Sequence, residues 1–224
     1  MHLLFALLLT VSAAFAADRP YDGAIYQTFG VVPPTWDPSQ HNDRTDDAWL
    51  YLALGDHEEA LKSVAGASED ISSAASEGAI DAGTASVLAA QHDYIEQCAG
   101  KMARYWAAVE AKDYGKAQSV ARSIRSELPP SRQAPSLYLK AVRVQIDQLN
   151  DVARRLVEVD RDRDDASWRE AMDGAWKLTD DVGEMWTLWR MTDEQLALIE
   201  EQMGAVYTRG DEVLNPNPLL GLRN

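Results

Sequence analysis

Between residues 46 and 214 the apolar side chains recur at alternating intervals of three and four residues, which is the period of an amphipathic α-helix. The pattern is most regular over residues 84–111, where it holds through three full heptads. The members of this apolar stripe are Leu88, His92, Ile95, Ala99, Met102, Trp106 and Val109. Such sustained spacing predicts an all-α fold in which antiparallel helices pack at shallow crossing angles, as in a bundle.

Helix stop and capping signals divide the same region into about seven helices. The stop signals are Gly55, the segment 77–83, Pro129-Pro130 and Asn215-Pro216. The expected N-capping residues are Asp56, Asp113, Ser167 and Thr192, and capping-box partners follow the first, third and fourth of them at Glu59, Glu170 and Gln195. We therefore expect an antiparallel helical bundle of about seven helices, built from three helical hairpins plus a closing helix.

The two ends of the chain differ in composition from its helical region. Residues 1–16 form an apolar run without Lys or Arg that ends in Ala14-Phe15-Ala16, which predicts a secretory signal peptide. The alternative is an uncleaved anchor, although the run is shorter than the roughly 20 residues that a spanning helix needs. Residues 17–45 are expected to form an irregular N-terminal strap, residues 46–214 the helical-hairpin bundle, and residues 215–224 a C-terminal tail. The protein is therefore expected to be periplasmic or secreted, and not membrane-spanning after signal cleavage.

The chain is acidic, with a formal net charge of -15 at pH 7. This charge argues against nucleic acid as a partner, because phosphate binding requires a basic surface. Residues 101–163 nevertheless contain more basic than acidic side chains, whereas the segments on both sides are acidic. Either a basic hairpin packs between acidic neighbours, or its basic face binds an anionic ligand.

The residues that usually carry catalysis or bind metals form no complete motif. The segment 57–61 has Leu61 where a zinc-protease motif requires its second histidine. The segment 160–165 begins like a calcium loop, but Ala171 stands where the bidentate glutamate belongs. Because Cys98 is the only cysteine, neither an intrachain disulfide nor the Cys-x-x-Cys-His motif of covalent haem can form. The sequence predicts no catalytic residue, no metal site and no cofactor, which indicates a non-catalytic protein.

Two groups of residues remain as candidates for binding. His92, Met102 and Trp106 share the stripe of residues 84–111, and a ligand pocket inside the bundle is one interpretation; a core histidine with satisfied hydrogen bonds is the other. Trp176 and Met185 lie beside the stripe expected in the helix that follows Ser167, and they form either a partner-binding patch or part of a wide core. That stripe is Trp168, Met172, Ala175, Thr179, Val182, Trp186 and Trp189.

A short pattern, in which Asp or Ser precedes a ring residue and Ala follows three residues later, occurs at three expected turns. Its ring residues are His57, Tyr114 and Trp168, which lie 57 and 54 residues apart. Around the first turn, small, aromatic and turn residues stand at Ala48, Tyr51, Gly55, Asp56, Glu58, Glu59, Ala60 and Ala67. In these positions the first hairpin resembles a tetratricopeptide repeat, although Lys112 replaces the glycine at the second turn and the family's period is 34 residues. The resemblance implies a protein-interaction scaffold.

Two functions are therefore expected from the sequence. The first is an exported, non-catalytic protein-interaction or scaffold module for a protein partner that the sequence does not identify, and it predicts an exposed apolar groove on the inner helices. The alternative is a small-ligand or cofactor carrier with a pocket inside the helical bundle, near His92, Met102 and Trp106.

Overall fold

The computed structural model describes residues 43–126, 136–161, 167–188 and 190–215. This part of the chain contains seven α-helices and no strand, which confirms the expected all-α fold. In chain order the helices are α3 (Asp43–Ala53), α4 (His57–Ser76), α5 (Ala82–Glu110), α6 (Tyr114–Ser126), α7 (Ser136–Val159), α8 (Trp168–Thr187) and α9 (Asp193–Leu214). None of these helices combines the length and the apolar character needed to cross a membrane. The expected signal peptide, most of the strap and most of the tail lie outside the described residues.

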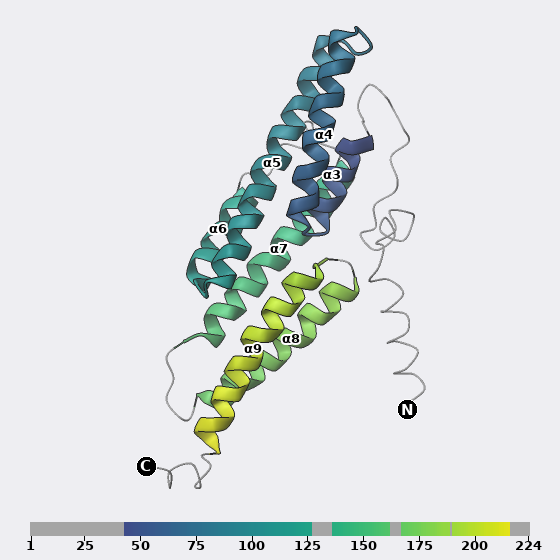
Figure 1. Ribbon diagram of the computed structural model, residues 1–224. Helices are drawn as coiled ribbons and strands as arrows, with labels where there is room; N and C mark the ends of the chain where they lie inside the picture. Colours follow the sequence, from purple (N-terminus) through teal and green to yellow (C-terminus); the bar gives the residue numbers. More distant parts are fainter. Residues whose placement is uncertain (1–42, 127–135, 162–166, 189, 216–224) are drawn as a thin grey trace, which may run out of the picture.

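Helices that follow one another in the chain pack side by side (Figure 1). The long helix α5 pairs with α4 over its N-terminal part and with α6 over its C-terminal part, and α7 returns beside α6. The α8–α9 pair lies at the opposite end of the elongated molecule from the tip where α4 meets α5. In one respect the pairing differs from three hairpins plus a closing helix, because α8 packs more extensively on α9 than on α7.

Helix α3 lies in the centre of the core although it is the shortest helix described. It begins at Asp43, so the last residues of the expected strap are helical. Three neighbours, α4, α5 and α7, pack around it, and Trp49, Leu52 and Ala53 are fully buried. The Trp49 indole N–H donates to Gln91 of α5 at 3.1 Å, and its ring stacks on Tyr94 with centroids 5.4 Å apart. These contacts fix α3 to the middle of α5.

The buried faces of the helices follow the expected stripe in α5 but not in α8. All seven residues of the α5 stripe, from Leu88 to Val109, are buried, which confirms that prediction. In α8 the buried residues are Ala171, Ala175, Leu178, Val182 and Met185. The expected stripe is therefore wrong at Trp168, Met172, Thr179 and Trp186, which are only partly buried, and its last member, Trp189, lies outside the described residues. Both stripes have three-four spacing, and contact with α9 rather than spacing selects the one that is buried.

The turns after α3 and after α5 have the same geometry although their sequences differ. Gly55 has φ +76° and Lys112 has φ +58°, so both residues adopt the left-handed conformation. At each turn this residue donates to the carbonyl three residues before it, and the following aspartate donates to the carbonyl five residues before itself. This is the Schellman arrangement that ends many helices. The resemblance between the two turns therefore extends to their backbone, despite the missing glycine at the second.

The capping predictions have different outcomes at different helices. Asp56 accepts from the Glu59 backbone N–H at 3.1 Å, and Asp113 accepts from that of Lys116 at 3.1 Å, as expected. The box at Thr192 is complete, with the side chain and backbone of Gln195 paired to it. The box expected at Ser167 is wrong: that residue has helical backbone angles and makes no side-chain cap hydrogen bond. A helical φ,ψ pair prevents the hydroxyl from reaching the free backbone N–H groups.

Buried glutamines connect helices to the ends of other helices. Gln195 and Gln202 of α9 donate to the carbonyl oxygens of Gly55 and Val109, at 2.9 and 2.8 Å, and Gln145 of α7 donates to that of Arg190 at 2.9 Å. Gln202 also accepts from the Tyr114 hydroxyl at 2.8 Å. Because the two glutamines of α9 are seven residues apart, they share one face of the helix. Hydrogen bonds therefore join that face of α9 to the turns that follow α3 and α5.

Candidate ligand-binding site

Both ring nitrogens of His92 form hydrogen bonds with side chains of neighbouring helices. Nε2 lies 2.8 Å from the hydroxyl of Thr45 in α3, and Nδ1 lies 2.9 Å from that of Ser68 in α4. The ring is 4% exposed, and burial lowers its pKa, while the nearby carboxylate of Asp93 partly opposes that effect. His92 is therefore a satisfied core histidine that links three helices, one of the two interpretations given by the sequence.

The structure does not bring the three expected pocket residues together. Met102 is fully buried in the core, and the ten residues between it and His92 correspond to about 15 Å along a helix. Trp106 is 7% exposed and does line a pocket, but neither of the other two residues is part of that lining.

The two expected partner-binding residues are also separated. Trp176 is 68% exposed, whereas Met185 is buried at 8% and belongs to the apolar core. Met185 is buried because it lies on the face that α8 packs into the molecule, together with Val182 and Leu178. Trp176 therefore stands without Met185 on the surface of α8.

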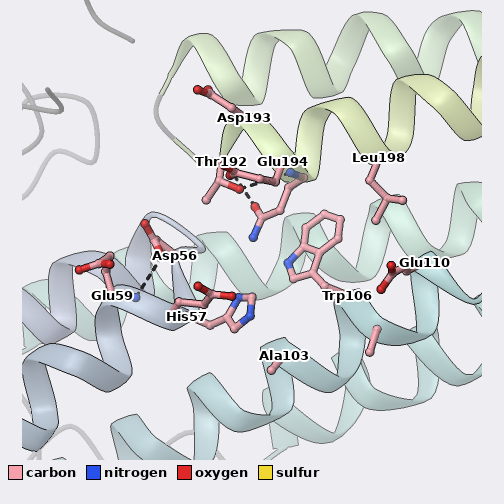
Figure 2. A pocket seen from close by; sticks show the side chains of 13 residues that line it. Asp56, His57, Glu59, Ala103, Trp106, Glu110, Thr192, Asp193, Glu194 and Leu198 are labelled. Carbon is pink, nitrogen blue, oxygen red and sulfur yellow. Dashed lines mark hydrogen bonds between the residues drawn. The ribbon is translucent and has the colours of Figure 1, made fainter. Parts of the chain in front are cut away.

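A pocket of about 740 Å³ lies between the N-termini of α4 and α9 and the C-terminal half of α5 (Figure 2). Helix α4 and its cap contribute residues 56–59, and α9 and its cap contribute residues 192–195 together with Leu198. The wall from α5 consists of Ala103, Trp106, Ala107 and Glu110. The volume lies within the range of about 300–1,000 Å³ that is usual for small-molecule sites.

Carboxylates dominate the polar lining of this pocket. They are Asp56, Glu58, Glu59, Glu110, Asp193 and Glu194, and no Lys or Arg is among the described lining residues. Those in the first turns of α4 and α9 stabilise the positive ends of these helix dipoles, which by itself accounts for their presence. Glu110 has no such role, because it is the last residue of α5, where a helix dipole disfavours a carboxylate. The acidic character of the pocket thus exceeds what helix capping requires.

The inner part of the pocket contains two ring nitrogens without a hydrogen-bond partner among the described residues. They are Nε1 of Trp106 and Nδ1 of His57, and both atoms are buried. Figure 2 shows the nitrogen-bearing edge of Trp106 turned toward His57 across the pocket. Trp106 can only donate, whereas a neutral histidine nitrogen donates or accepts according to its tautomer. Most buried polar atoms in proteins are paired, and two of the seven such unpaired side-chain atoms among the described residues line this one pocket.

Gln195 is another polar side chain of the inner pocket, and it forms its hydrogen bonds within the protein. Its Oε1 accepts from the Thr192 backbone N–H at 3.0 Å, while its Nε2 donates to Gly55 at 2.9 Å. Close to the entrance, Asp193 accepts from the Trp186 indole at 2.6 Å, and Glu59 pairs with Lys62. The Gln195 and Asp193 contacts join the N-terminus of α9 to the turn after α3 and to α8, whereas the Glu59–Lys62 pair lies within α4.

A second pocket, of about 490 Å³, lies near the N-terminus of α8, and its lining contains both basic side chains and the carboxylates of Glu158 and Glu170. Its lining includes Arg155, Arg161 and Lys177. Arg155 is paired with Asp181 of α8, so part of this positive charge is neutralised by a neighbouring helix. This contact agrees with a basic segment that packs against acidic neighbours.

The sequence indicated the parts of the acidic pocket but not the pocket itself. Acidic pairs follow the caps Asp56 and Thr192, which was the available signal. No pattern in the sequence shows that these two helix N-termini meet, because 136 residues separate the caps and only the packing of α9 joins them. His57 was noted as the ring residue of a turn, and its place opposite Trp106 follows from the same packing. In the described part of the chain, no cluster of His, Cys, Asp and Glu is arranged to hold a metal ion.

Comparisons with protein-family models, with curated proteins and with solved structures found no match to the chain. The resemblance of the first hairpin to a tetratricopeptide repeat therefore stays a prediction. The acidic pocket is the feature of the molecule on which a function can be based.

Proposed function

We propose that this protein binds a small organic cation, an amine or a guanidinium, in the pocket between α4, α5 and α9. The observation that carries the proposal is the lining of that pocket, with six carboxylates, no basic side chain among the described residues, and the aromatic ring of Trp106. An exported location is part of the proposal, and it is supported by the apolar segment 1–16 and by the small residues Ala14 and Ala16 at its end.

The balance of charges favours a cation over an anion. Two helix N-termini face the pocket, and each is equivalent to roughly half a positive charge. Six carboxylates outweigh that contribution several times, even when Glu59 is paired with Lys62. Trp106 adds a ring whose face attracts a cation, and such contacts contribute about 0.5–2 kcal/mol.

This proposal retains the carrier function expected from the sequence but changes its residues. His57 takes the place of His92, and Trp106 is the one residue common to both sites. Binding, rather than catalysis, is proposed because no hydrogen bond among the described residues pairs the buried nitrogens of His57 and Trp106 with an acid, a base or a nucleophile.

The proposal is tested by titrating the ¹⁵N-labelled protein with pentylamine, and with 1-pentanol and pentanoate as neutral and anionic controls. The indole N–H signal of Trp106 is followed by NMR and is assigned by its loss in Trp106→Phe. We expect a saturable shift of this signal with pentylamine only, and weaker binding at high salt because exposed charges are screened.

A matched pair of charge variants separates the pocket from the overall charge of the protein. Glu110→Gln with Glu194→Gln removes two carboxylates of the pocket and should weaken pentylamine about fivefold. Glu200→Gln with Glu201→Gln removes two exposed carboxylates of α9 outside the lining and should leave the affinity unchanged. Equal affinities in both variants, or no difference between pentylamine and pentanol, would show that the pocket does not bind cations.

A protein-interaction function remains the second candidate, and Trp176 is the observation that favours it. A tryptophan exposed at 68% is unusual on a solvated helix and is typical of interface hot spots. The other large apolar side chains that are exposed in the described residues are spread over several helices, namely Val87, Val144, Leu188 and Tyr207. Co-purification with the full-length protein should therefore be lost in Trp176→Ala and kept in Val87→Ala; equal recovery of a partner by both variants argues against this surface.

A further inference from the structure

The two unpartnered nitrogens in the inner pocket give information about the ligand beyond its charge. Trp106 is more than nine-tenths buried, yet its indole N–H has no acceptor among the described residues. His57 Nδ1 is likewise buried and has no hydrogen-bond partner among the described residues, and both side chains line the pocket. An unpaired buried donor or acceptor destabilises a folded protein, so a ligand that pairs with both atoms gains affinity by relieving that cost.

Four of the six carboxylates lie in a different part of the pocket from the two nitrogens. Glu58, Glu110, Asp193 and Glu194 are exposed, so they surround the entrance. Trp106 is buried and lies deeper, with its nitrogen toward His57 (Figure 2). A ligand that fills the pocket therefore meets negative charge at one end and ring nitrogens without a hydrogen-bond partner at the other.

We infer that the ligand is an amine or guanidinium that also carries an uncharged amide, with the cation at the carboxylate entrance and the amide at Trp106 and His57. This inference rests on the proposed cation-binding function. The Trp106 N–H donates to the amide carbonyl. Nδ1 of His57, in the tautomer with its proton on Nε2, accepts from the amide N–H.

An amide fits these two atoms better than other acceptors do. A carboxylate accepts from Trp106 but offers no proton to His57, and it adds a negative charge to a pocket that already holds six carboxylates. An alkyl chain pairs with neither nitrogen. An amide provides a donor and an acceptor without charge and on two different atoms, whereas a hydroxyl provides both on a single oxygen.

The test compares three ligands of similar length by calorimetry with the full-length protein: pentylamine, 5-aminopentanamide and 5-aminopentanoate. We expect 5-aminopentanamide to bind about five- to tenfold more tightly than pentylamine, which corresponds to one or two neutral hydrogen bonds. In Trp106→Phe and in His57→Phe the ratio of the two affinities should fall by at least half on a logarithmic scale, because each variant removes one of the two hydrogen bonds to the amide. In the unaltered protein the Trp106 indole proton should shift downfield with the amide and much less with pentylamine, which provides a measurement that needs no variant.

The outcomes separate this inference from the function on which it rests. Pentylamine and 5-aminopentanamide binding with equal affinity would overturn the amide assignment and leave the cation-binding function intact. Tighter binding of 5-aminopentanoate than of the amide would overturn it as well, since the inner pocket would then favour an anion. If none of the three amines binds, the cation-binding function fails and the inference fails with it.

Discussion

Gln195 of α9 donates a hydrogen bond from its side-chain amide to the carbonyl oxygen of Gly55 at 2.9 Å, across 140 residues of sequence. The same side chain accepts from the Thr192 backbone N–H and so completes the cap of α9. One glutamine therefore joins the turn after α3 to the start of α9. The acidic pocket lies between these two segments, so its shape depends on this bond.

Replacement of Gln195 by Ala should destabilise the protein by about 2 kcal/mol, because a buried carbonyl loses its donor and the capping box loses one member. Urea unfolding followed by circular dichroism measures the change. Gln97→Ala, at an exposed position of α5, is the control and should change the stability by less than about 0.5 kcal/mol. A loss that is equally small in both variants would mean that the Gly55 contact contributes nothing measurable.

Gly55→Ala should destabilise by about 3 kcal/mol. A Cβ atom at this position would collide with Nε2 of Gln145, and the residue has φ +76°, which is unfavourable for alanine. Gly100→Ala is the matched control, because a Cβ there meets no atom within 4 Å and the residue lies inside α5. That change should stabilise the protein by about 0.5–1 kcal/mol, as alanine is the better helix former. Chemical denaturation of the two variants should thus give shifts of opposite sign.

Lys112→Gly should stabilise the protein by up to about 1 kcal/mol. The native lysine is held at φ +58° in the turn after α5, and glycine adopts this conformation without the steric cost of a Cβ atom. Lys112→Ala is the control for the loss of charge and should have little effect, since alanine keeps the Cβ atom. A gain of the same size in both variants would assign the effect to charge and not to backbone strain. The midpoint of thermal unfolding provides the measurement.

Acidification should destabilise the protein through His92. Burial lowers the folded-state pKa of this histidine below its ordinary value of 6.5, so the unfolded state binds a proton more readily between the two pKa values. Stability from the neutral ring is therefore fully present above about pH 6.5 and is lost as the pH falls toward the folded-state pKa. Within this interval, each pH unit of acidification lowers the free energy of unfolding by about 1.4 kcal/mol.

The control for this pH dependence is His92→Gln, which keeps a polar side chain near Thr45 and Ser68 but does not titrate. Unfolding free energies are measured at pH 7.5, 6.0 and 5.0. The difference between the unaltered protein and the variant should shrink as the pH falls. A constant difference over this range would show that His92 does not titrate on unfolding.

Much of the fold follows from local sequence signals. Asp56, Asp113 and Thr192 set the N-termini of α4, α6 and α9. Each side chain accepts a hydrogen bond from a backbone N–H in the first turn of the helix that it caps. The cap expected at Ser167 failed because its backbone is helical, a property that the side chain alone does not reveal. The left-handed conformation of Lys112 was likewise not predictable from residue type, since lysine rarely adopts it.

The candidate site was less predictable than the fold. Trp106 was identified because it lies on a regular apolar stripe, but the same reasoning selected His92 and Met102, which serve the core. In α8, two stripes one residue apart satisfy the same helical period, so Met185 and Trp186 were interchangeable on the basis of sequence. A period specifies that one face is buried, and the neighbouring helices decide which face it is.

The sequence by itself determined that the described residues between 46 and 214 are mainly helical, where most of these helices end, and which face of α5 is buried. These properties depend on residues a few positions apart. Only the tertiary structure decided that the capped starts of α4 and α9 meet opposite Trp106. The contact that joins them, from Gln195 to Gly55, spans 140 residues, and one of its two partners is a backbone carbonyl that every residue possesses. Such a contact has no sequence signature, and it exists only once the helices have packed.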